Sequence, residues 1–134
     1  MVLVVQKYGG SSVAGAERIQ QVAGRIASRV ESGDRVVAVV SAMAKTTDEL
    51  IALAQLITSE PRAREMDVLL STGEMVSSTL LSMALHDLGL DAISLSGAQA
   101  GIRTDAVFGR ARIAGIDTER IERELSDNLS LIHI

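Results

Sequence analysis

Two short apolar runs separated by a helical stripe most constrain the fold of this chain. Residues 2–5 and 36–40 are continuous runs rich in β-branched side chains, which is typical of buried strands. Between them, apolar residues recur at intervals of three and four over residues 19–30, which predicts an amphipathic helix ending at Gly33. A strand, a helix and another strand in this order predict two parallel strands joined by a crossover helix.

The same alternation continues to residue 125. A helix is predicted over residues 50–57, starting at a capping box in which Thr46 is the N-cap and Glu49 reaches back. Two further helices are expected on either side of residues 71–74, which interrupt the apolar pattern and resemble a second capping box. The chain is therefore α/β, with a mostly parallel sheet and helices on both faces. The remaining expected elements are strands over residues 91–96 and 111–116 and a helix over 117–125.

Composition narrows the class of protein. The chain has 134 residues, 47% of them hydrophobic, with a net charge of −4 and no cysteine, which suits one globular domain without disulfides or thiolate metal sites. An acidic balance without a basic cluster argues against a nucleic-acid or membrane surface. The N-terminus does not resemble a signal peptide, and no uninterrupted apolar stretch is long enough to span a bilayer. We expect a cytoplasmic protein.

The stretch VVQKYGGSSV, residues 4–13, is the first candidate site. In parallel α/β sheets ligands bind beyond the carboxyl ends of the strands, which is where Lys7 and the following glycines are expected. Glycines let the backbone approach an anion, and a lysine supplies a charge suited to phosphate oxygens. A glycine turn beside a solvated lysine is the alternative interpretation, and the segment by itself favours it.

Two other loops carry candidate residues. Ser41 and Thr47 flank the end of the second strand and the start of the next helix, where hydroxyls bind a substrate or simply cap the helix. Glu74 either recognises a substrate ammonium or forms the inner half of a capping box. His86 is expected at the surface. No spacing of His, Cys or carboxylates resembles a metal site.

Taken together, these stretches resemble the aspartate kinases of the amino-acid kinase superfamily. VQKYGGSSV, ERI, VVSAM with TTDEL, REMDVLLSTGE, ISLSGAQAGIRTD and GRARI occur in the family's order, over about residues 2–125. The resemblance implies a carbamate kinase-like fold, truncated here to the N-terminal part of a kinase domain. It also implies phosphoryl transfer from ATP, with Mg2+ carried by the nucleotide, to the side chain of L-aspartate, in biosynthesis of lysine, threonine and methionine.

The resemblance also assigns roles. Lys7, Tyr8, Gly9 and Gly10 would form the loop that binds the ATP phosphates, with Lys7 catalytic because it stabilises the transferring group. The aspartate would be held by Ser41, Thr47 and Glu74, with Glu74 facing its ammonium group. The parent enzyme is expected to be oligomeric.

The sequence departs from the family pattern at two places. Ala44 replaces a usual glycine, and its methyl group is tolerated without strain only if the backbone keeps φ below zero. After residue 125 the glycine-rich loop of the family is replaced by a divergent tail, residues 126–134, so we expect the chain alone to be inactive. Two alternatives stay open: another kinase of the superfamily, such as a glutamate or acetylglutamate kinase, and a non-catalytic module that binds an anion or an amino acid.

Overall fold

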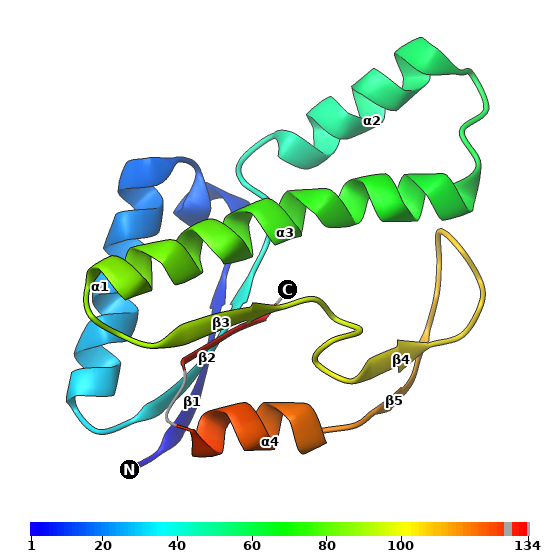
Figure 1. Cartoon of the computed structure of the whole chain (residues 1–134). Coiled ribbons are helices and arrows are strands. Elements are labelled where there is room, and N and C mark those ends of the chain that lie inside the picture. Colours follow the sequence, from blue (N-terminus) through cyan, green and yellow to red (C-terminus); the bar gives the residue numbers. More distant parts are fainter. Residues whose placement is uncertain (128–129, 134) are drawn as a thin grey trace.

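Strands and helices alternate along the chain, as the sequence predicts (Figure 1). A computed structural model describes residues 1–127 and 130–133. In chain order the elements are β1 (Leu3–Tyr8), η1 (Gly10–Val13), α1 (Ala16–Glu31), β2 (Arg35–Val40), α2 (Thr46–Ile57), α3 (Ala63–Asp87), β3 (Ala92–Leu95), β4 (Ile102–Thr104), β5 (Ile113–Ile116), α4 (Glu119–Ser126) and β6 (Ser130–His133).

The main sheet has four parallel strands in the order β1-β2-β6-β3. Val5 pairs with Val37, and Val37 pairs in turn with Leu131 of β6. Strand β6 comes from the segment that the sequence set apart as a divergent tail, and it lies between β2 and β3. Strands β4 and β5 form a separate antiparallel pair; the sequence predicted β5 but gave no indication of β4.

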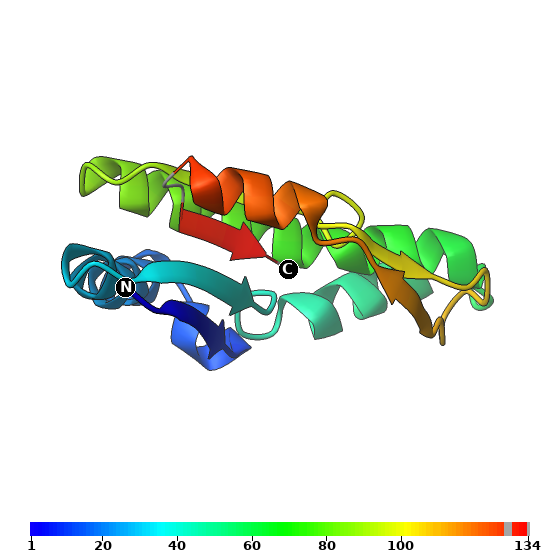
Figure 2. The same cartoon turned by 90° about the horizontal axis from the view of Figure 1, so that it is seen from below.

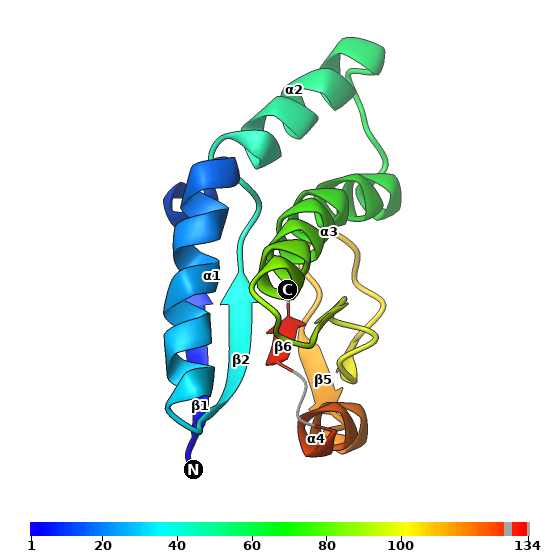
Figure 3. The same cartoon turned by 60° about the vertical axis from the view of Figure 1, so that its left-hand side comes forward.

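Helices cover both faces of the main sheet, as expected. On one face, α1 and α3 pack side by side over Val36, Ala38 and Val40 of β2. On the other face, α4 contributes Leu125, which packs with Val37. Figures 2 and 3 show this separation, with α4 on the opposite side of the strands from α1 and α3. The alternation of β2 side chains between two cores explains why its sequence is apolar throughout.

Helix α3 is one continuous helix of 25 residues, so the predicted break at residues 71–74 is wrong. The hydroxyls of Ser71 and Thr72 donate to the carbonyls of Val68 and Leu69 in their own helix, at 2.7 and 2.6 Å, and so need no cap. By length and composition α3 could also cross a membrane, contrary to expectation. In the structure it packs against α1, α2 and β3 instead.

The ends of two helices test the capping predictions. Gly33 follows α1 with φ of 89°, which confirms the predicted left-handed residue after the helix. The capping box predicted at α2 is wrong. Thr46 is already the first helical residue, Lys45 is the N-cap, and no side-chain hydrogen bond caps this helix. The carboxylate of Asp48, in the first turn, still stabilises the helix through its interaction with the helix dipole.

Candidate active site

Lys7 and Tyr8 end β1 with side chains on opposite faces. Lys7 is exposed, like Val5 on the same face. Tyr8 is 9% exposed and packs in the core with α1, where its hydroxyl donates to Gln6 Oε1 at 3.0 Å. Burial raises the pKa of Tyr8 above its usual value of 10.0, an effect that the charge of Arg25 partly offsets. The tyrosine ring therefore belongs to the core, and the Tyr8 backbone borders the following loop.

The turn after β1 lies against the loop after β2. The carbonyl of Tyr8 accepts a hydrogen bond from the amide of Ser41 at 3.1 Å, and the carbonyl of Gly10 accepts one from the amide of Ala44 at 3.0 Å. A Cβ atom at Gly10 would lie 2.8 Å from the carbonyl oxygen of Ala42, closer than real Cβ atoms come. This contact therefore requires glycine.

Ala44 adopts φ of 40°, in the left-handed region that favours glycine. The condition under which the methyl group would be tolerated without strain, a φ below zero, is therefore not met. The Ala44 amide is held by Gly10, and α2 begins two residues later with the Thr46 amide donating to the Met43 carbonyl at 2.8 Å. The chain turns sharply between these hydrogen bonds. A non-glycine residue in this conformation costs about 1–2 kcal/mol.

Helix α3 lies close to the same loop. A Cβ atom at Gly73 would be 2.9 Å from Ala42 Cβ and 3.4 Å from Thr46 Cγ2, so a side chain here would displace the loop. One turn later, the buried hydroxyl of Ser77 donates to the carbonyl of Ser41 at 2.7 Å. The sequence did not single out Ser77, because a serine within a helical pattern gives no signal of a contact with a residue 36 positions away.

The structure thus brings the three candidate segments together, the first two through backbone hydrogen bonds and the third through packing of Gly73 against Ala42 and Thr46. Figure 1 shows the ends of β1 and β2 near the middle of α3. Gly9 is exposed, and a Cβ atom there would meet nothing within 4 Å. Thr47 is half-buried in the first turn of α2, and Glu74 is half-buried beside Gly73. Because α3 is continuous, Glu74 is not part of a helix cap, and that alternative is wrong.

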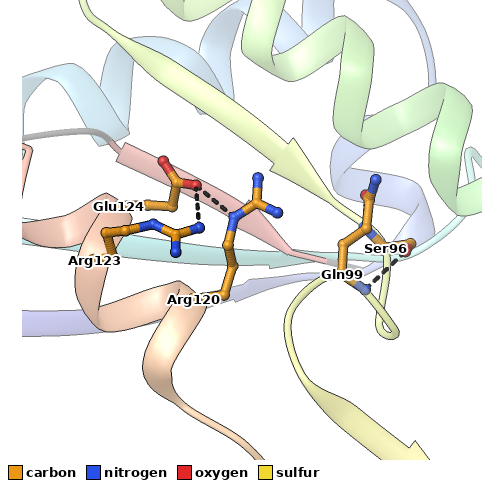
Figure 4. Close-up of polar contacts among 5 residues, drawn as sticks. All are labelled: Ser96, Gln99, Arg120, Arg123 and Glu124. Carbon is orange, nitrogen blue, oxygen red and sulfur yellow. Dashed lines mark hydrogen bonds and ion pairs between the residues drawn. The ribbon is translucent and has the colours of Figure 1, made fainter.

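Other polar groups and cavities lie apart from these segments. The turn after β3 is closed by Ser96 and Gln99, each amide donating to the other's side chain, at 2.9 and 3.2 Å (Figure 4). Figure 4 also shows Arg120 and Arg123 of α4 paired with Glu124. Among residues 1–127 and 130–133, no group of three or more His, Cys, Asp or Glu side chains could hold a metal ion. His86 is exposed, as predicted.

An apolar cavity of about 660 Å³ lies between α1 and α3. Its walls contain none of the seven candidate residues, although Met43 comes from the loop after β2. The cavity is lined by Ala16, Ile19, Gln20, Ala23, Met43, Leu80, Met83, Ala84, Asp87 and Leu88.

Sequence comparisons identify relatives over nearly the whole chain. A family model described as the amino acid kinase family matches residues 2–133. The aspartokinase of Geobacillus stearothermophilus is 55% identical over 132 residues, which cover 98% of this chain and 32% of that protein. Aspartokinase 2 of Bacillus subtilis (strain 168) is 54% identical over 125 residues, 93% of this chain and 31% of that protein. The chain therefore spans about a third of the length of these curated relatives.

Solved structures agree with the sequence matches. The aspartate kinase of Synechocystis superposes with a TM-score of 0.83 at 47% identity, covering 99% of this chain and 21% of that one. Aspartokinase III of E. coli, solved in complex with aspartate and ADP, has a TM-score of 0.82 at 20% identity over 99% of this chain and 40% of that one, a likeness of fold. With its own sequence matched over residues 2–133, the chain belongs to the amino acid kinase family.

Proposed function

We propose that the protein containing this chain is an aspartate kinase, which transfers the γ-phosphoryl group of ATP to the side-chain carboxylate of L-aspartate. The observation that carries this proposal is the 55% identity to an aspartokinase over 132 residues, which include all seven candidate residues. The joining of the two loops at the carboxyl ends of β1 and β2, with α3 packed beside them, supports it, because α/β sheets bind ligands at these strand ends.

In this proposal the turn after β1 binds the phosphates of ATP. Gly9 is open on the surface, so a phosphate can approach its backbone closely, while Gly10 anchors the turn to the loop after β2. Tyr8 contributes through its backbone, since its ring is buried. The exposed ammonium of Lys7 neutralises charge that develops on the transferring group.

The other two segments bind aspartate. The hydroxyls of Ser41 and Thr47 lie at the end of β2 and in the first turn of α2, and they hydrogen-bond the carboxylate groups. Glu74 supplies a negative charge for the ammonium group from the middle of α3. These three residues come from separate elements that pack on one another through Ala42 and Gly73, which favours a fixed geometry.

The chemistry follows from this arrangement. A side-chain oxygen of aspartate forms a bond to the γ-phosphorus as the bond from that phosphorus to the bridging oxygen of ADP breaks, giving 4-phospho-L-aspartate. Mg2+ carried by the nucleotide would supply further charge neutralisation. The protein contributes orientation and fixed charge, which account for most catalysis of phosphoryl transfer. A cytoplasmic location and an oligomeric full-length enzyme stay predictions.

The test is a substrate comparison with the full-length product of the gene. Acyl phosphate is trapped with hydroxylamine after incubation with MgATP and aspartate, glutamate or N-acetylglutamate. Of the three acceptors, we expect only aspartate to give hydroxamate. Product with another of these substrates would identify a different kinase of the family, and binding of ATP or aspartate without any product would favour a non-catalytic module.

A further inference from the structure

Helix α3 carries a series of hydroxyl side chains, and one of them differs from its neighbours. Ser71, Thr72, Ser78 and Thr79 all donate to carbonyls three or four residues earlier in the same helix. Such bonds satisfy the hydroxyl locally and connect nothing else. Ser77 also reaches out of the helix, to the carbonyl of a residue in the loop after β2.

The hydrogen bonds of Ser77 join two segments of the proposed aspartate site. Its Oγ lies 2.7 Å from the carbonyl oxygen of Ser41 and 3.1 Å from that of Glu74. A serine hydroxyl has a single hydrogen, so the shorter contact is the main bond. Ser77 therefore holds the peptide after Ser41 at a set distance from the helical turn that carries Glu74.

Ser41 is fixed from both sides. Its amide donates to the carbonyl of Tyr8 at 3.1 Å, and its carbonyl accepts from Ser77 at 2.7 Å. Ser77 itself has no exposed surface, so water does not compete for its hydroxyl. Loss of that hydroxyl would leave the Ser41 carbonyl without this partner and free the peptide to rotate.

We infer that Ser77 is a positioning residue: through its hydrogen bond to the Ser41 carbonyl it sets the orientation of Ser41 relative to Glu74 and so the affinity for the amino-acid substrate. This inference rests on the proposed function. It assigns Ser77 no contact with substrate. Its effect is expected mainly on the amino-acid side of the site, because the Ser77 hydroxyl lies directly against the carbonyls of Ser41 and Glu74. It reaches the phosphate loop only indirectly, through the Ser41 amide and the Tyr8 carbonyl, and that loop is also held by the hydrogen bond between Gly10 and Ala44.

The experiment compares Ser77→Ala with Ser78→Ala in the full-length product of the gene. Ser78 is a matched control because it is equally buried, is adjacent in α3 and bonds only within its helix. We expect Ser77→Ala to raise the KM for aspartate about tenfold and the KM for ATP less than about twofold, as loss of one buried hydrogen bond implies. Ser78→Ala should change neither. Hydrogen–deuterium exchange should become faster over residues 41–47 in Ser77→Ala alone.

The KM values and the exchange rates of the two variants test the positioning role of Ser77. Equal rises in both KM values, or equal effects of the two variants, would overturn the positioning role, because a general loss of stability affects both substrates. If the wild-type protein phosphorylates no aspartate, the proposed function is wrong. In that case hydrogen–deuterium exchange alone tests whether Ser77 fixes the loop after β2. Unchanged exchange over residues 41–47 in Ser77→Ala would show that it does not.

Discussion

The amide of Ala44 donates a 3.0 Å hydrogen bond to the carbonyl of Gly10, from a backbone with φ of 40°. The hydrogen bond joins the proposed phosphate loop to the loop that carries Ser41. An alanine therefore holds, under strain, a position where glycine would be relaxed. The resemblance to the aspartate kinases drew attention to Ala44 as a departure from the family pattern, and the structure shows its physical consequence.

Replacing Ala44 with glycine should stabilise the chain. Relief of the left-handed strain outweighs the greater freedom of glycine in the unfolded state, so we expect the free energy of unfolding to rise by about 0.5–1 kcal/mol. Urea unfolding followed by circular dichroism measures it. Ala52→Gly, at an exposed interior position of α2, is the control and should lower stability by about 1 kcal/mol. A loss of stability in Ala44→Gly would contradict the strain.

The two glycines after β1 should respond differently to alanine. At Gly10 the new Cβ atom would meet the Ala42 carbonyl at 2.8 Å, and we expect a loss of about 1–3 kcal/mol as the backbone shifts. At Gly9 a Cβ atom meets nothing within 4 Å and φ is −74°, so the change should stay within about 0.5 kcal/mol. Similar losses in both variants, measured by the same unfolding experiment, would argue against the close contact.

Glu74→Gln should weaken the binding of aspartate and leave the binding of ATP almost unchanged. In the full-length enzyme we expect the KM for aspartate to rise roughly 10- to 100-fold, since the negative charge that pairs with the substrate ammonium group is lost, while the KM for ATP changes little. Steady-state kinetics with one substrate saturating measures both constants. Glu65→Gln removes an exposed carboxylate from the same helix and should change neither. If both constants rise together in Glu74→Gln, the residue is structural.

Tyr8 should titrate above its usual pKa of 10.0 in the folded chain. Above pH 10 the unfolded chain loses the phenolic proton while the folded chain keeps it. The free energy of unfolding therefore falls as the pH rises from about 10 toward the raised pKa. Tyr8 is the single tyrosine and there is no tryptophan, so ultraviolet absorbance reports its ionisation directly. Equal midpoints in native and denatured samples would show that burial does not affect it, and Tyr8→Phe should weaken the pH dependence of stability.

The 134-residue chain on its own should form no aspartyl phosphate. The expectation comes from the comparisons, in which the chain spans only about a third of the length of the aspartokinases that it matches. Purified chain incubated with MgATP, aspartate and hydroxylamine should give hydroxamate no higher than the blank, while the full-length product gives a clear signal. Activity of the chain above the blank would show that it carries every group that the reaction needs.

Periodicity predicted most of the fold because burial repeats along the chain. The stripe over residues 19–30 became the buried side of α1, and the apolar run over residues 36–40 became the buried strand β2. The run over residues 2–5 also forms a strand, β1, but its predicted burial is wrong, because Val2, Leu3 and Val5 are exposed. Strand β4 was missed because three residues are too few for a pattern. Residues 71–74 were wrongly predicted to interrupt the helix, because Ser71 and Thr72 are residue types that often cap helices. In α3 their hydroxyls donate hydrogen bonds to carbonyls of the same helix.

The candidate site was predictable where the residue type carries the chemistry. Lysine, adjacent glycines, hydroxyls and a carboxylate pointed to three segments, and the structure brings those segments together through backbone hydrogen bonds and through packing of Gly73 on Ala42. Their individual roles stay predictions. Ser77, Ala42 and Gly73 were not predictable, because their importance lies in contacts between residues distant in sequence. The left-handed conformation of Ala44 likewise depends on a hydrogen bond across two loops.

The position of β6 has a consequence for biosynthesis of the protein. Val37 of β2 pairs with Leu131, so the ribosome must make almost a hundred residues before β2 gains its second neighbour. Until then β2 and β3 both present open edges to the cell. Emerging chains are therefore exposed to misassembly while residues 38–131 are being made, and we expect chaperones that bind nascent chains to engage this segment.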